Sequence, residues 1–127
     1  MSKSDILTRK DVELLIDSFY KRVVKDDMIG FFFNDVIRLD WQKHIPVMYD
    51  FWESVLFQKP TYRGNPLQKH LHLHQLHALK KEHFDQWLLL FSKTLDDLFC
   101  GEKTELAKTR ALSIATVIQI KIAEISS

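Results

Sequence analysis

A single histidine, placed just after a turn and a helix start, is the first candidate for chemistry in this chain. Tyr62-x-Gly64 has the composition of a tight loop, and Asn65-Pro66 favours a helix start, with Asn as the cap and Pro in the first turn. His70 follows one turn into that helix. Imidazole is a common ligand of metal ions and of haem iron. His70 is therefore our leading ligand candidate.

The histidines that follow His70 offer a second interpretation of the same segment. On a helix, His70, His74 and His77 share one face while His72 points away, so three imidazoles could converge on a zinc ion. Zinc sites usually add a thiolate, a carboxylate or another side chain at a suggestive spacing, and Cys100 lies far away in the sequence. A solvated histidine-rich turn explains the spacing more simply. A zinc-binding bundle stays an alternative.

Aromatic side chains are abundant: the chain has nine Phe, three Trp and three Tyr. A single imidazole that binds haem needs an apolar slot, rings that line it and a polar donor on the opposite side of the iron. The segments that could supply these groups are Phe19-Tyr20, Trp41-Gln42-Lys43-His44, Phe51-Trp52 and His83-Phe84-Asp85-Gln86-Trp87. The sequence thus offers a ligand, rings and donors together.

The elements that must position these residues are predicted to be helices. Apolar residues recur at steps of three and four, and no segment alternates polar and apolar residues over the length of a strand. The expected helices are a first one around 12–23 after Thr8-Arg9-Lys10-Asp11, one capped by Asp40, a short one from Pro66, one over about 80–99 and one over about 103–125. We therefore predict an all-α fold.

Pro46 conflicts with the helix that Asp40 would cap. Proline removes a helical N–H and clashes with the preceding turn. The helix is expected either to kink at Pro46 or to begin at about His44.

Composition narrows the classes of function. With 127 residues, 46% of them hydrophobic, the chain is long enough for one core, so we expect a single domain over 1–127. Lys and Arg number 18 against 17 Asp and Glu, which gives no basic face for nucleic acid. The longest apolar runs, 29–33 and 87–91, are too short to span a membrane.

Cysteine content and the first residues predict the compartment. The polar start of the chain does not resemble a signal sequence. Cys100 is the only cysteine, so no intramolecular disulfide forms, which agrees with a reducing environment. We expect Cys100 to be a small buried side chain near a helix end, and the protein to be cytoplasmic.

The order and spacing of these motifs resemble those of the group III truncated haemoglobins. The resemblance runs from Leu14 to Ile125 and is carried by Phe19-Tyr20, Phe31-Phe32-Phe33-Asn34, Trp41-Gln42-Lys43-His44, Phe51-Trp52, Tyr62-x-Gly64-x-Pro66-Leu67-x-x-His70 and His83-Phe84-Asp85-Gln86-Trp87-Leu88-x-x-Phe91. It implies a two-over-two helical sandwich around haem b. The segment between His70 and Trp87 departs from the family pattern by being longer and richer in histidine, so His72 or His74 could compete as the ligand.

The resemblance also implies roles for individual residues. His70 matches the proximal ligand of the iron, and Tyr20, His44 and Trp87 match residues of the distal side. The remaining expected haem contacts are Phe33, Met48, Trp52 and Leu67. For most of these rings, ordinary core packing is the competing interpretation.

The function that the resemblance implies is the binding of O2 and other diatomic gases such as NO and CO. Preplaced O–H and N–H donors in a dry pocket stabilise the partial negative charge of bound oxygen. Tight binding of oxygen suits chemistry on the bound ligand, for example conversion of nitric oxide to nitrate or peroxide reduction, better than oxygen transport. The chain has three glycines and no Gly-x-Gly, so turnover would require a separate reductase. A cofactor-free helical interaction module is the other alternative.

Overall fold

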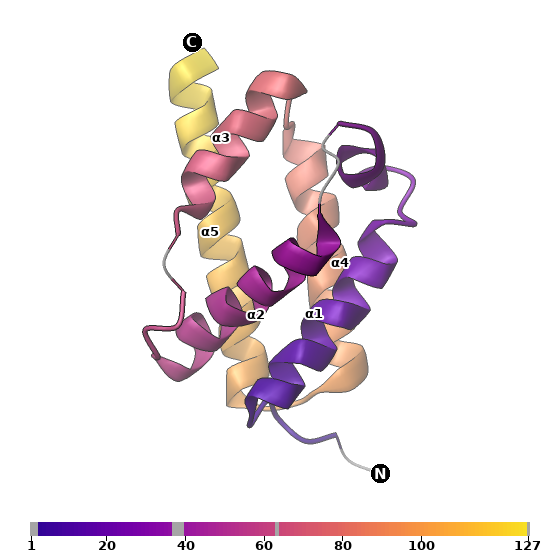
Figure 1. The fold of residues 1–127 in the computed structure, drawn as a ribbon, viewed down its shortest axis with the longest axis vertical. Helices are drawn as coiled ribbons and strands as arrows, with labels where there is room; N and C mark the ends of the chain where they lie inside the picture. Colours follow the sequence, from indigo (N-terminus) through magenta and orange to yellow (C-terminus); the bar gives the residue numbers. More distant parts are fainter. Residues whose placement is uncertain (1–2, 37–39, 63, 127) are drawn as a thin grey trace.

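The computed structural model describes residues 3–36, 40–62 and 64–126, and within these ranges every regular element is a helix. The elements are α1 (Arg9–Val23), the short π-helical turn η1 (Phe32–Val36), α2 (Trp41–Phe57), α3 (Pro66–Leu76), α4 (Lys81–Leu98) and α5 (Glu102–Ser126), as Figure 1 shows. The all-α prediction is confirmed.

The helices form two packed layers. α1 packs on α2 and on α4, α4 packs on α5, and α2 reaches α5, so the α1–α2 pair lies over the α4–α5 pair (Figure 1). α3 lies beside this sandwich, along the C-terminal half of α5. The largest fully buried side chains between the layers are Phe19, Phe91, Ile6, Leu15, Ile16, Leu56 and Leu95. The predicted two-over-two sandwich is present.

α1 buries one face of an amphipathic pattern. Its buried residues are Val12, Leu15, Ile16, Phe19 and Val23, which recur at steps of three and four. At its start the Asp11 carboxylate accepts the backbone N–H of Thr8 at 3.1 Å, as the capping-box pattern predicts. This register places Tyr20 next to Phe19, at the edge of the core.

α2 begins where its cap predicts and continues through the proline. The Asp40 side chain accepts the backbone N–H of Gln42 at 3.2 Å, and the helix starts at Trp41. The alternative start near His44 is therefore wrong. Pro46 lies on the exposed side of the second turn. The helix ends at Phe57, where Gln58 adopts a left-handed conformation with φ of 56°.

The N-terminal segment caps the last helix. The Asp5 carboxylate accepts the backbone N–H groups of Lys103 at 2.8 Å and Thr104 at 2.9 Å, and also the Thr104 hydroxyl at 2.8 Å. Gly101 has φ of 145°, and a Cβ there would lie 2.5 Å from Asp5 Cγ, so the turn requires glycine. Cys100, expected to be buried, is exposed because this turn lies on the surface.

Candidate functional site

Two neutral polar side chains meet where α1 crosses α2. His44 Nε2 lies 3.2 Å from the Tyr20 hydroxyl, within hydrogen-bond distance. Burial raises the pKa of Tyr20. Burial also lowers the pKa of His44, and the nearby ammonium group of Lys69 adds to that effect. The pair therefore offers an O–H and an uncharged imidazole at neutral pH.

Aromatic rings surround this pair. The Phe33 ring lies 5.9 Å from the Tyr20 ring and stacks on the Trp41 ring at 5.8 Å. Trp41 also packs edge-on against Tyr20 at 5.5 Å. A hollow of about 350 Å³ on the molecular surface reaches Tyr20 and Trp41 from outside. The rings of Tyr20 and Trp41 thus form part of the wall that separates the Tyr20 hydroxyl and the His44 imidazole from solvent.

Trp41 belongs to this site although it was not among the predicted haem contacts. It stands three residues before His44, so both side chains lie on the same face of α2, and their rings are 5.9 Å apart. That spacing is visible in the sequence. It is ambiguous there, since an aromatic residue at a helix start packs in the core of many proteins.

Trp87 joins the site through the core. Its ring packs edge-on against Phe19 at 5.6 Å and stacks on Phe91 at 5.4 Å. Phe19 in turn contacts Tyr20 at 5.2 Å. Trp87 and Phe91 of α4 therefore close the site on the side of the core, and the same rings pack between the two helical layers.

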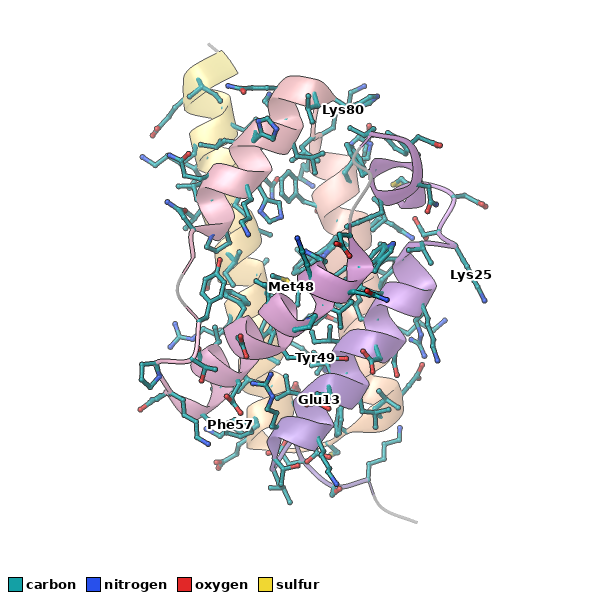
Figure 2. The ribbon with its side chains drawn as sticks, viewed as in Figure 1. Glu13, Lys25, Met48, Tyr49, Phe57 and Lys80 are labelled. Carbon is teal, nitrogen blue, oxygen red and sulfur yellow. The ribbon has the colours of Figure 1, made fainter. Side chains whose placement is uncertain are left out.

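Trp52 and Met48 lie further along α2. Trp52 is 3% exposed and packs against Phe91 at 4.8 Å, so most of its surface serves the core. Met48 is half-buried against the same core, and Figure 2 shows it midway along α2, on the side toward α3. Tyr49, by contrast, faces α1, where its hydroxyl donates to Asp17 (Figure 2). Met48 therefore lies on the side of α2 that faces the helix carrying His70.

His70 has the tautomer that a proximal ligand requires. Asn65 caps α3 by accepting the N–H of Gln68 at 3.1 Å, as predicted, and this cap sets the first turn. His70 Nδ1 lies 2.6 Å from the carbonyl oxygen of Pro66. Because a carbonyl only accepts, Nδ1 carries the proton and Nε2 keeps its lone pair. Burial lowers the pKa of His70, against the opposing effect of the Pro66 bond, so the ring is neutral.

α3 packs incompletely against the protein. None of its eleven residues, all of them described, is fully buried. Leu67 and Leu71 rest on a small cluster formed by α4 and α5 around Phe84 and Ile118. The leucines of α3 are therefore only partly covered by other side chains, and part of their apolar surface is accessible.

Comparison with known proteins identifies the family. Residues 5–120 match the family described as bacterial-like globin. This chain belongs to that family. The globin is 31% identical over 120 residues to a group 3 truncated hemoglobin of Campylobacter jejuni, with 92% of each chain covered. The crystal structure of a group III truncated hemoglobin from Campylobacter jejuni superimposes with a TM-score of 0.80 at 30% identity, covering 94% of each chain. These matches bear out the resemblance to group III truncated haemoglobins.

Membership in this family implies a haem cofactor, and the residues of the globin fit one. The tautomer of His70 leaves one nitrogen ready for iron, and the surface of α3 is partly uncovered. Lys69 on α3 lowers the pKa of His44 on α2, so the two helices present polar side chains toward a common region. Rings from η1, α2 and α4 pack around the Tyr20–His44 pair and the neighbouring core. This donor set is one imidazole with aromatic walls, which suits haem.

Two other histidines of the 70–77 segment have contacts of their own. His74 Nδ1 accepts the N–H of Leu79 at 3.0 Å, and the His77 ring packs against Phe31 at 4.9 Å. Among the residues that the structure describes, no three His, Cys, Asp or Glu side chains are placed to hold a metal ion. The zinc-binding alternative is not favoured.

In the described part of the chain, no helix has the length and apolar character that crossing a membrane requires.

Proposed function

We propose that residues 1–127 form one globin domain that binds haem b through His70 Nε2 and takes O2 and other diatomic gases on the side lined by Tyr20 and His44. The observation that carries this proposal is the bond from His70 Nδ1 to the Pro66 carbonyl. It fixes a neutral imidazole with a free Nε2 on a helix that is only partly covered.

Bound haem supplies an iron atom that takes gases reversibly and exchanges electrons. The side chains of this chain would do the rest. The Tyr20 O–H, kept protonated by burial, would donate to the negative end of a polar gas ligand, with His44 orienting the hydroxyl. Phe33, Met48 and Trp41 would exclude water from the site. Trp87 would close the site on the side of α4, and Trp52 and Leu67 would contact the edge of the porphyrin.

We propose further that this globin carries out chemistry on the gas, such as oxidation of NO to nitrate or reduction of peroxide, in preference to transport. A neutral phenol and imidazole side by side form a strongly polar pocket, and polar donors slow the release of oxygen. Slow release of oxygen gives time for a reaction at the site, whereas delivery of oxygen requires fast release. Repeated turnover would require electrons from a separate reductase, and we place the protein in the cytoplasm, where such partners and a reducing environment exist.

Haem titration tests the cofactor. Addition of hemin to the purified chain should give a sharp absorbance band that saturates at one haem per chain and should raise the unfolding temperature. A zinc chelator should change neither result. No saturable band, or loss of stability on chelation, would overturn the proposal.

Nitrate formation tests the reaction. The reduced, oxygen-saturated protein should convert added NO to nitrate with one NO consumed per haem. Release of free oxygen without nitrate would contradict the proposed chemistry and leave haem binding intact.

A further inference from the structure

The loop between α1 and η1 is attached to the first turns of α4. Gln86 Nε2 donates to Asp26 Oδ1 at 2.7 Å, and the other oxygen of Asp26 accepts the backbone N–H groups of Met28 and Ile29, each at 3.0 Å. This clamp fixes the start of the segment that continues into Phe33. The exposed start of α4 therefore positions a segment that lies far from it in the sequence.

A second attachment lies one turn earlier on α4. The His83 ring packs edge-on against Phe32 at 4.9 Å and lies 6.0 Å from Phe31. The His77 ring, at the end of α3, contacts the same two rings at 5.4 Å and 4.9 Å. Two histidines and two phenylalanines thus join the end of α3, the start of α4 and the segment that carries Phe33.

His83 also caps α4. Its Nδ1 accepts the backbone N–H of Lys80 at 2.9 Å, in the position where a capping box usually has Glu or Gln. Only an unprotonated Nδ1 accepts a hydrogen bond, so the ring is neutral with its proton on Nε2. Protonation would place an N–H against the Lys80 N–H and remove the cap.

We propose that His83 is a positioning residue that, only as a neutral imidazole, holds the α3–α4 junction against the Phe31–Phe33 segment. The same ring carries out both tasks, because it accepts the N–H of Lys80 with one edge and packs on Phe32 with another. Acid would therefore release the cap and loosen the aromatic cluster together.

The charges around His83 agree with this assignment. Burial lowers the pKa of His83, Glu82 opposes that effect, and Lys80 and His77 reinforce it. From the α1–η1 segment the contacts are the uncharged rings of Phe31 and Phe32, and the nearby Asp26 carboxylate bonds to Gln86. A folded-state pKa below the unfolded value means that the contribution is fully present above about pH 6.5 and is lost as the pH falls below it.

The consequence for the cofactor rests on the proposed function. If Phe33 lines the haem, loosening of the segment at acid pH would speed haem loss. The positioning role itself does not depend on haem, so it is tested separately.

Two substitutions separate the cap from the ring. His83→Gln keeps an acceptor for the Lys80 N–H and does not titrate, whereas His83→Phe keeps an aromatic ring and has no acceptor. Both would be compared with the unaltered full chain, used as purified but with any haem iron reduced and bound to carbon monoxide, so that it is diamagnetic. The readouts are the ¹⁵N resonances of the His83 ring and hydrogen exchange of the Lys80 amide between pH 5 and pH 8.

In the unaltered chain, we expect Nδ1 to be unprotonated at pH 7.5 and the protection of the Lys80 amide to fall about tenfold by pH 5. His83→Gln should keep that protection across the range, and His83→Phe should lack it throughout. A protonated Nδ1 at pH 7.5 would overturn the proposal. Equal pH dependence in the unaltered chain and in His83→Gln would do the same, whether or not the protein binds haem.

Discussion

The hydroxyl of Tyr20 and the imidazole of His44 lie 3.2 Å apart across the contact between α1 and α2. The two residues come from different helices, so the packing of α1 on α2 sets the distance between them. The polar pocket therefore depends on both residues together. Burial keeps the phenol protonated and the imidazole uncharged. In the proposed site, Tyr20 donates to the gas ligand while His44 orients its hydroxyl, which makes Tyr20 the first residue to test.

Tyr20→Phe should release oxygen roughly tenfold to a hundredfold faster. A hydrogen bond to a partly charged acceptor contributes about 1.5–3 kcal/mol, and its loss appears in the dissociation rate. Carbon monoxide carries less negative charge, so its rate should change much less. Trp87→Phe, which removes the indole N–H that the family resemblance assigns to the distal side, should act in the same direction. Stopped-flow measurement of both gases gives the comparison.

Tyr49→Phe is the matched control for Tyr20→Phe. It also removes a phenol bonded between α1 and α2, but that hydroxyl donates to Asp17 and faces α1 (Figure 2). Oxygen release from this variant should stay within about twofold of the unaltered rate, a difference of less than 0.5 kcal/mol. Equal changes for oxygen and carbon monoxide in Tyr20→Phe would mean that Tyr20 acts by packing.

His70→Ala should lose stable haem. His70 is the histidine whose Nδ1 bond to Pro66 prepares Nε2 for iron. His72→Ala, an exposed position on the same helix, should retain haem, as should His74→Ala and His77→Ala. The haem absorbance band after gel filtration measures retention. Retention by His70→Ala with loss by His72→Ala or His74→Ala would reassign the ligand within the histidine-rich segment.

Asp5→Ala should lower the free energy of unfolding by about 1 kcal/mol, which is typical for loss of a helix cap. The variant leaves the N–H groups of Lys103 and Thr104 without the carboxylate that accepts them. Asp5→Asn retains one acceptor oxygen and should lose less. Urea unfolding followed by circular dichroism would measure both. An unchanged midpoint for Asp5→Ala would show that water replaces the cap at no cost.

Acid should weaken the same cap. Burial alone would raise the pKa of Asp5, but hydrogen bonds from Lys103, Thr104 and Ile6 outweigh it and lower the pKa. The contribution of Asp5 is therefore present above the ordinary pKa of about 3.8 and is lost as the pH falls through the lower folded value. The stability difference between the unaltered chain and Asp5→Ala should shrink below pH 4. A difference that stays constant to pH 2 would show that the charge of Asp5 is not involved.

Arg9→Met should destabilise the protein by about 1–3 kcal/mol, because it leaves a buried carboxylate without its cation. Glu53 is 6% exposed, and one of its oxygens lies 3.2 Å from Arg9 Nη1 and 2.8 Å from the Thr61 hydroxyl. Adding Glu53→Gln to Arg9→Met should recover part of the loss in thermal unfolding. If the double variant is no more stable than the single one, the ion pair does not stabilise this contact.

The helices and their caps were predictable from the sequence because they depend on neighbouring residues. The caps at Asp40 and Asn65, the buried stripe of α1 and the end of α4 near Gly101 all follow from spacing within a few residues. The placement of His70 one turn after Pro66 has the same origin. That turn brings its Nδ1 to the Pro66 carbonyl, so this contact follows from local sequence. The role of His70 as an iron ligand stays a prediction from the family resemblance.

Only the tertiary structure decided which distant side chains meet. The capping of α5 by Asp5 is a contact between segments remote in sequence. The continuation of α2 through Pro46 and the exposure of Cys100 also became clear only in the folded chain. The same holds for Tyr20 with His44 and for Trp41 with Phe33. The apolar pattern gives each helix a buried face, but the angle at which two faces cross is set by how their side chains interlock. A pocket formed where helices cross therefore has residues that the sequence suggests and a geometry that packing determines.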